Sequence, residues 1–150
     1  MTWYEADAFC HWLNSVIGTS DQVIRLPHEI EWEAAARGKT NQIYPYEGNT
    51  YQAVWANGRL TNINRTSAVG LLPEGDSPFG VSDMSGNVYE WCQDVIQDDY
   101  DKPSDYEQRR VLRGGSWRSY PGFLRNTSRY SAYPYLSTNY WGFRIVRAIQ

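Results

Sequence analysis

The sequence predicts a single α+β domain with a large share of irregular structure. Two segments near the N-terminus carry helix signals, and shorter segments after residue 80 carry strand signals. Helices and strands gathered in separate parts of a chain are typical of the α+β class. Twelve Gly and seven Pro divide the 150 residues into short pieces, which favours ordered loops. Neither an internal repeat nor a linker interrupts the chain, so we expect one domain over residues 1–150.

The first helix is predicted to begin at Thr2. Thr2 and Glu5 have the spacing of a capping box, in which each side chain satisfies a backbone N–H of the first turn. Apolar residues then recur at helical spacing and are expected to face the core, namely Ala6, Phe9, Cys10, Leu13 and Val16. Gly18 is the expected end.

A second helix is predicted over residues 28–37. Pro27 suits a first-turn position, glutamates fill the N-terminal half, and Gly38 follows as a stop. Trp32 and either Ala35 or Ala36 are expected to face the core.

Three strands are predicted, over residues 88–95, 110–113 and 142–148. Residues 39–80 show no sustained period and are expected to form ordered loop with short strands. Residues 94–106 are acidic and polar, which is typical of a solvated turn.

Composition and charge indicate what kind of core, partner and location to expect. Seven Trp and twelve Tyr against two Met predict a core built on aromatic rings. A net charge of −3 argues against nucleic acid as a partner. Neither a membrane span nor a signal peptide is visible, so we expect a cytoplasmic protein. Cys10 is expected to be a buried thiol, with a Cys10–Cys92 bridge as the alternative.

Five segments in order resemble the formylglycine-generating-enzyme and sulfatase-modifying family. They include Gly-Asn-Val-Tyr-Glu-Trp at 86–91, Arg-Gly-Gly-Ser-Trp at 113–117 and Gly-Phe-Arg at 142–144, with further blocks at 3–13 and 25–38. The resemblance implies a C-type-lectin-like fold, with two helices around a small twisted, mainly antiparallel sheet and long loops. Family members usually carry a further stretch before the first helix, so we expect a minimal version or the C-terminal part of a longer protein.

The chemistry of the family enzymes is not expected here. The resemblance implies two copper-binding cysteines between Trp117 and Trp141, where this chain has none, because Cys10 and Cys92 lie in other blocks. A second enzyme branch uses a histidine cluster and iron, whereas this chain has only His11 and His28. We therefore predict a protein that is not an enzyme and that requires no cofactor.

Calcium is the one metal that the resemblance implies. Carried over, its ligands are the Asp83 carboxylate, the Gly86 and Val88 carbonyls and the Glu90 carboxylate, all oxygen ligands that suit a hard cation. The alternative is that Asp83 and Glu90 bind only loop backbone N–H groups.

Residues 117–141, called the recognition segment below, have the composition of an antibody paratope. Five Tyr stand among Ser, Gly, Thr and Asn, without Lys, Glu, Asp or Gln. Tyr supplies rigid contact area at low entropy cost, and the small residues supply adaptable polar contacts. Pro121 and Pro134 oppose regular structure. The alternative is a buried structural loop, but clustered Tyr hydroxyls would then each need a partner.

Arg-Val-Leu-Arg-Gly-Gly-Ser-Trp at 110–117 is followed by Pro121, Leu124-Arg125, Arg129, Pro134 and Gly-Phe-Arg at 142–144. This pattern of fixed residues resembles the variable region of diversity-generating retroelement proteins. In that family, the adenines of template Asn codons are mutagenised, so the first two bases of an AAC or AAT codon can change and many residue types result. Codons for Lys, Glu, Gln, Met and Trp cannot arise in this way. The fifteen positions that would vary include none of the five: Arg118, Ser119, Tyr120, Gly122, Phe123, Ser128, Tyr130, Ser131, Ala132, Tyr133, Tyr135, Leu136, Thr138, Asn139 and Tyr140.

The sequence therefore predicts a receptor-type domain with a diversified Tyr- and Ser-rich surface. Its ligand is a protein, a peptide or a small molecule. The expected aromatic anchors are Tyr120, Phe123, Tyr130, Tyr133, Tyr135 and Tyr140. The alternatives are a formylglycine-generating-type oxidase and a degenerate relative that serves as a regulatory appendage.

Overall fold

The computed structural model describes residues 1–96 and 108–149. Helix α1 (Trp3–Ile17), strand β1 (Gln22–Arg25) and helix α2 (Glu29–Arg37) come first. Strands β2 (Tyr89–Val95), β3 (Arg110–Arg113), β4 (Arg129–Ala132), β5 (Trp141–Phe143) and β6 (Val146–Ile149) follow, with 3-10 turns η1 (Arg59–Thr61), η2 (Pro73–Gly75) and η4 (Pro121–Phe123) in the loops. The α+β, C-type-lectin-like architecture predicted from the sequence is confirmed.

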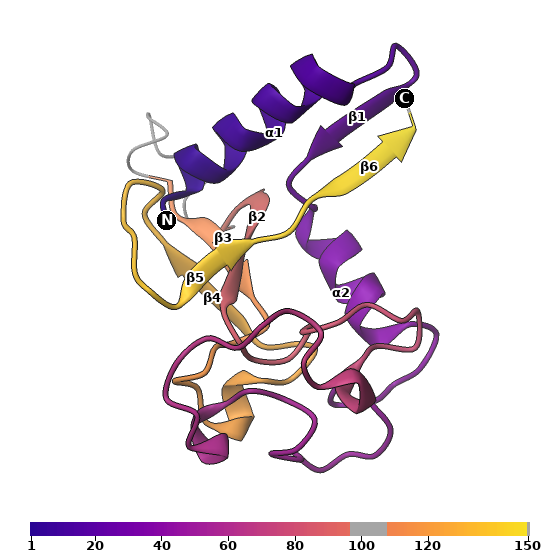
Figure 1. Cartoon of the computed structure of the whole chain (residues 1–150), viewed down its shortest axis with the longest axis vertical. Helices are drawn as coiled ribbons and strands as arrows, with labels where there is room; N and C mark the ends of the chain where they lie inside the picture. Colours follow the sequence, from indigo (N-terminus) through magenta and orange to yellow (C-terminus); the bar gives the residue numbers. More distant parts are fainter. Residues whose placement is uncertain (97–107, 150) are drawn as a thin grey trace.

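The strands form two sheets. One has the order β4-β3-β2-β5, antiparallel except for the parallel β2–β5 pair, and the other pairs β1 with β6 antiparallel. Figure 1 shows α1 lying along the β1–β6 pair, while the long loops of residues 39–80 form the opposite end of the molecule. The recognition segment runs from this loop end back to the N-terminus.

Helix α1 begins at the expected cap, and both helices end at the expected glycines. The Glu5 backbone N–H donates to Thr2 Oγ1 at 3.1 Å, and the Thr2 N–H donates to Glu5 Oε2 at 2.6 Å, which confirms the capping box. Gly18 and Gly38 follow the two helices as their C-caps. One detail is wrong: the N-cap of α2 is His28, so Pro27 lies before the helix and not in its first turn.

Four of the seven Trp side chains are buried. Trp3, Trp91 and Trp141 pack with Cys10 between α1 and the larger sheet, and Trp32 packs with Cys92 on the side of α2. Successive side chains of a strand point to opposite faces, so Trp91 and Cys92 enter different clusters. Both thiols are free, and the alternative of a disulfide is therefore wrong.

The core-facing side of α1 is narrower than predicted. Ala6 and Cys10 are buried as expected, whereas Phe9 and Val16 are 39% and 57% exposed. The final turns of α1 run beside a two-stranded sheet, which is too small to cover the whole helix. Phe9 still packs edge-to-face on Phe143, with ring centroids 5.5 Å apart.

Several strand boundaries differ from the prediction. The predicted strand 142–148 is split at Arg144 into β5 and β6, because the Arg144 side chain turns inward to bind Glu90 of β2. Strand β1 was not predicted, and β4 forms where regular structure seemed disfavoured. In residues 39–80 the structure has 3-10 turns, not short strands. The predicted acidic turn lies mostly outside the described residues, and Asp94 and Val95 belong to β2.

Candidate ligand-binding surface

The recognition segment starts from a tight turn at Gly114 and Gly115, directly after β3. Both residues have positive φ, 88° and 73°. A Cβ atom at Gly115 would lie 2.6 Å from Leu124 Cδ2 and 2.7 Å from the Phe123 carbonyl oxygen. Only glycine fits this conformation and this space, so the turn brings the recognition segment back against its own start.

A buried arginine ties the segment to α2. The Arg113 side chain is 2% exposed, and its guanidinium binds Glu29 Oε1 at 2.5 Å and Glu33 Oε2 at 3.0 Å. The same guanidinium donates to the carbonyl oxygen of Asn126. On the outer side, Arg129 of β4 binds both oxygens of Glu29. The segment is therefore held to α2 directly through Arg129, and indirectly through the Asn126 carbonyl and the buried Arg113.

Hydrogen bonds with groups of the protein interior hold the η4 loop in place. Leu124 is fully buried, and its carbonyl oxygen accepts from Ser85 Oγ at 2.9 Å. The Tyr44 hydroxyl donates to the Pro121 carbonyl at 3.2 Å, and Asn126 Nδ2 donates to the Gln42 carbonyl at 3.0 Å. The fixed residues between the predicted variable positions thus act as anchors inside the protein.

The β4–β5 connection is attached to the N-terminus. Pro134 is buried, and its carbonyl oxygen accepts from the backbone N–H of Trp3 at 3.0 Å. On either side of this proline, the rings of Tyr133 and Tyr135 stack on each other, with centroids 5.6 Å apart and an interplanar angle of 12°. The connection therefore presents a pair of parallel rings on a pinned backbone.

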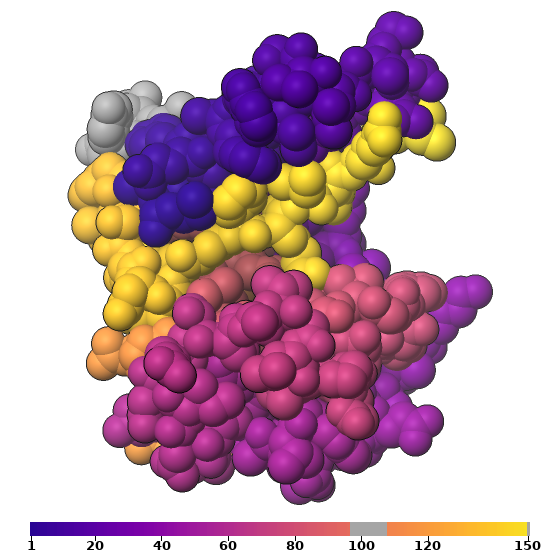
Figure 2. Space-filling model, in the orientation of Figure 1, coloured from indigo at the N-terminus to yellow at the C-terminus, as the bar shows by residue number. Residues whose placement is uncertain are grey.

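Five of the six expected aromatic anchors are exposed to solvent. Their exposed fractions are 54% for Tyr120, 56% for Phe123, 48% for Tyr130, 39% for Tyr133 and 48% for Tyr135. Leu136 is 42% exposed, and Arg118, Gly122 and Asn139 are also exposed. Ser128, Ser131 and Thr138 are partly exposed. Figure 2 shows the orange and yellow atoms of the recognition segment along one side of the molecule.

Two of the fifteen predicted contact residues are buried, and the largest of the partly exposed ones is Tyr140. Ser119 is 8% exposed, and its hydroxyl accepts the Ser116 N–H at 3.0 Å, so it belongs to the turn itself. Ala132 is 6% exposed because it points to the core side of β4. Tyr140 is half-buried between Trp117 and Trp141, so only part of its ring is available to a ligand.

Four of the five exposed rings fall into two groups, and the fifth, Tyr130, lies on β4. Tyr120 is the N-cap of η4 and Phe123 is its last residue, whereas Tyr133 and Tyr135 lie on the β4–β5 connection. In Figure 1 the orange turn of η4 lies at the loop end, and the connection between β4 and β5 passes near the N-terminus. The Arg59 guanidinium lies 5.3 Å from the Tyr120 ring centroid and adds a cation to the first group. Sequence reasoning missed Arg59, because it comes from η1, about 60 residues before Tyr120 in the chain.

The chain has two cysteines and two histidines, and both thiols are buried. Burial raises the pKa of Cys10 to about 11 and that of Cys92 well above its usual value, so both thiols stay protonated. His11 and His28, which lie on separate elements, line one groove beside Cys10. Within residues 1–96 and 108–149, no three His, Cys, Asp or Glu side chains are grouped closely enough to hold a metal.

One of the two carboxylates predicted to bind calcium, that of Glu90, is fully engaged by protein groups. Both oxygens of Glu90 are engaged by Arg144, Oε1 at 2.8 Å and Oε2 at 2.5 Å, and Oε2 also accepts from Trp32 Nε1 at 2.7 Å. Asp83 Oδ2 accepts from the Gly70 N–H at 2.9 Å, and burial raises the pKa of Asp83. The alternative, in which these carboxylates bind protein groups, matches this geometry.

Calcium is expected to leave the stability of the domain unchanged. A ligand present at a hundredfold excess over its Kd raises the free energy of unfolding by about 2.7 kcal/mol, which a thermal melt detects easily. Melts in millimolar Ca²⁺ and in EDTA should therefore give the same Tm. A higher Tm in Ca²⁺ that disappears in Asp83→Asn would contradict this expectation.

The chain belongs to a family with this fold. Residues 1–149 match the sulfatase-modifying factor enzyme 1-like domain. A similar protein, the serine/threonine-protein kinase pkn1 of Chlamydia pneumoniae, is 34% identical over 99% of this chain and 23% of its own length. The hercynine oxygenase of Mycolicibacterium smegmatis is 31% identical over 97% of the chain and 36% of its length. The chain thus spans about a quarter to a third of these relatives.

The family includes a protein described as inactive and shares its fold with a variable protein. The inactive C-alpha-formylglycine-generating enzyme 2 of Mus musculus is 35% identical over 78% of this chain and 36% of its own length. The solved structure of Treponema denticola variable protein 1 covers all of the chain with a TM-score of 0.83 and 24% identity, and the chain covers 70% of it. Among the described residues, no helix has the length and apolar character that a membrane crossing needs.

Proposed function

We propose that this chain is a non-catalytic ligand-binding domain that presents the recognition segment as a diversified contact surface. One observation carries the proposal: the exposed rings of Tyr120, Phe123, Tyr130, Tyr133 and Tyr135 stand on a backbone held by buried residues. Buried rings would have favoured a structural loop. Exposed aromatic side chains on a well-ordered frame favour binding instead.

The frame keeps the entropic cost of binding low. Leu124, Asn126 and Pro134 are buried and hydrogen-bonded between the exposed positions. Backbone that is already ordered loses little conformational freedom when a ligand binds. The same separation allows the exposed residues to change without loss of the fold. This division of roles is what a diversified binding surface requires, and the fold shared with a variable protein supports it.

The absence of catalysis is part of the proposal. The chain has two cysteines and two histidines, and both thiols are buried with raised pKa values. A copper or iron oxidase needs deprotonated sulfur ligands or a set of converging imidazoles. Neither is provided by the residues of this domain, although relatives in the same family include an oxygenase.

The DNA that adjoins the gene tests the diversified surface. We expect a near-copy of the codons for residues 110–144, with Asn codons at the exposed variable positions, next to a reverse-transcriptase gene. The buried residues Leu124, Asn126 and Pro134 should be identical in both copies, because they carry the frame. Flanking DNA without such a repeat would contradict diversification by this route.

A regulatory domain of a larger protein is the second candidate. The identity of 34% to a protein kinase, of which this chain spans 23%, favours it. The complete reading frame separates the candidates: a kinase domain joined to this chain, with the recognition segment unchanged among close homologues, would favour regulation.

A further inference from the structure

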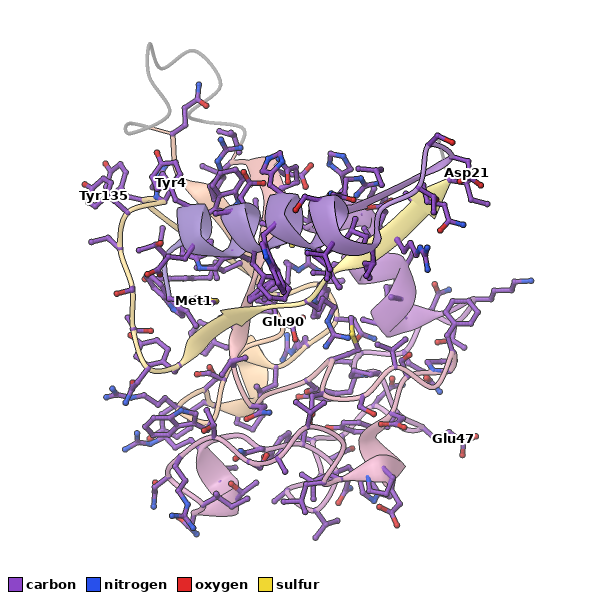
Figure 3. All side chains as sticks on the ribbon, turned by 45° about the horizontal axis from the view of Figure 1, so that its top comes forward. Met1, Tyr4, Asp21, Glu47, Glu90 and Tyr135 are labelled. Carbon is purple, nitrogen blue, oxygen red and sulfur yellow. The ribbon has the colours of Figure 1, made fainter. Side chains whose placement is uncertain are left out.

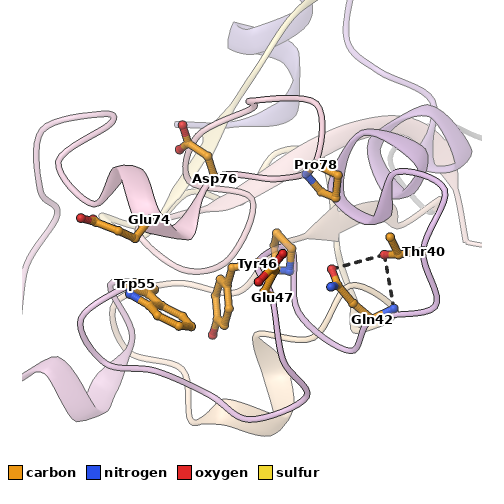
Figure 4. Close-up of a pocket in the computed structure, with 9 residues that line it drawn as sticks. Thr40, Gln42, Tyr46, Glu47, Trp55, Glu74, Asp76 and Pro78 are labelled. Carbon is orange, nitrogen blue, oxygen red and sulfur yellow. Dashed lines mark hydrogen bonds between the residues drawn. The ribbon is translucent and has the colours of Figure 1, made fainter.

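A cavity of about 450 Å³ lies in the loop end of the molecule, outside the recognition segment. Its walls come from residues 40–47, from Trp55 and from the η2 region at residues 74–78. Figure 4 shows Tyr46 and Trp55 side by side, with Glu74 and Glu47 on either side of the ring pair. A cavity of this size suits a small molecule or a single long side chain.

Two aromatic rings form an ordered corner in the cavity. The ring centroids of Tyr46 and Trp55 are 5.3 Å apart, and the rings meet at 69°. The ring of Tyr44 stacks on that of Tyr46, with centroids 5.5 Å apart, and the backbone N–H of Trp55 donates to the Gln52 carbonyl at 3.1 Å. Tyr46 is buried, whereas Trp55 is half-buried and offers indole surface to the cavity.

The cavity carries only negative charge. Its nine lining residues include Glu47, Glu74 and Asp76, and none is Lys, Arg or His. Asp76 Oδ1 is enclosed by protein and accepts no hydrogen bond from the described residues. Three carboxylates around aromatic walls of low polarity attract a positively charged ligand.

The arrangement favours an organic cation over a metal ion. A metal needs several carboxylates that converge on one point, and no such group occurs among the described side chains. A quaternary ammonium spreads its charge over methyl groups, so it gains from aromatic surface and from carboxylates that do not touch it. A primary ammonium is more strongly hydrated and loses more on entering such a cavity.

We propose that the cavity formed by Tyr46, Trp55, Glu47, Glu74 and Asp76 binds a quaternary ammonium group. Trp55 supplies the face that contacts the methyl groups, and the three carboxylates supply the charge. The site is independent of the proposed function, because none of its lining residues lies in the recognition segment.

Titration with tetramethylammonium, followed by backbone and indole N–H chemical shifts, tests the proposal. We expect saturable shifts that centre on Trp55, and weaker binding as salt concentration rises. Choline should bind in the same place, and its neutral isostere 3,3-dimethylbutan-1-ol should not. The primary ammonium ion n-butylammonium should bind more weakly than tetramethylammonium.

Three variants locate the site. Trp55→Leu keeps an apolar side chain but removes the aromatic face, and should weaken binding about tenfold. The pair Glu47→Gln and Glu74→Gln changes two exposed side chains, so the fold is retained while affinity and its salt dependence fall. Asp21→Asn is the matched control, because it removes an exposed carboxylate far from the cavity, as the positions of Asp21 and Glu47 in Figure 3 show. Its affinity should equal that of the wild type.

Three results would overturn the proposal. Equal binding of 3,3-dimethylbutan-1-ol would show that charge plays no part. Equal or tighter binding of n-butylammonium would exclude a preference for quaternary ammonium. Unchanged affinity in both Glu47→Gln/Glu74→Gln and Trp55→Leu would place the binding elsewhere. None of these results bears on ligand binding by the recognition segment.

Discussion

Replacing Arg113 with alanine is expected to lower the free energy of unfolding by about 3–5 kcal/mol, because the change breaks a buried ion-pair network. The Arg113 side chain is 2% exposed and binds Glu29, Glu33 and the Asn126 carbonyl. Without it, Glu33 keeps its pair with Arg37, but the Asn126 carbonyl loses a buried donor. Urea unfolding followed by far-UV circular dichroism measures the loss.

Arg25→Ala provides the matched control for Arg113→Ala. Arg25 also forms a two-point pair, with Glu31, but the two side chains are 25% and 38% exposed. Water screens such a pair, and its removal should cost about 1 kcal/mol or less. Arg113→Lys should fall between the two, because lysine keeps the charge but lacks the planar fork. Equal losses in Arg113→Ala and Arg25→Ala would show that burial does not set the strength of these pairs.

The double change of Tyr133 and Tyr135 to alanine is expected to abolish ligand binding while stability stays nearly constant. The two rings are stacked and exposed, so their loss should lower the free energy of unfolding by about 1 kcal/mol. Aromatic anchors at the centre of an interface contribute about 2 kcal/mol or more each, which is about thirtyfold in affinity per ring. Surface plasmon resonance against the first ligand captured by the wild-type domain measures the change.

Trp91→Ala is the comparison for the double tyrosine change. Trp91 is fully buried and packs edge-to-face on Trp141, with centroids 5.2 Å apart. Its loss should destabilise the domain by about 3–5 kcal/mol through the cavity that it leaves. If the tyrosine variant lost as much stability as Trp91→Ala, the two rings would be part of the core and the proposed binding surface would be wrong.

Local signals in the chain were sufficient for the helices but not for every strand. Two signals of the helices involve residues only a few positions apart, namely the capping box at Thr2 and Glu5 and the glycine after each helix. The structure contains all of them. Strand β4 exists only because β3 offers it hydrogen bonds, with Leu112 opposite Tyr130. The split at Arg144 depends on Glu90, about 50 residues earlier. A pattern within one segment of the sequence includes neither the partner strand β3 nor the partner residue Glu90.

The same limit applies to the candidate sites. Composition alone indicated an outward-facing aromatic segment, since clustered Tyr hydroxyls would each need a partner if buried, and five of the six expected rings are exposed. Composition did not show that Ser119 and Ala132 point inward, because a side chain's direction depends on the turn and the sheet around it.

Residue types and their local order were enough to predict the family, the helix caps and the aromatic character of both core and surface. The pairing of charges, the exposure of individual rings and the meeting of Tyr46, Trp55 and three carboxylates emerge only in the folded chain. Burial and electrostatic pairing depend on distances between residues far apart in the sequence, and folding sets those distances.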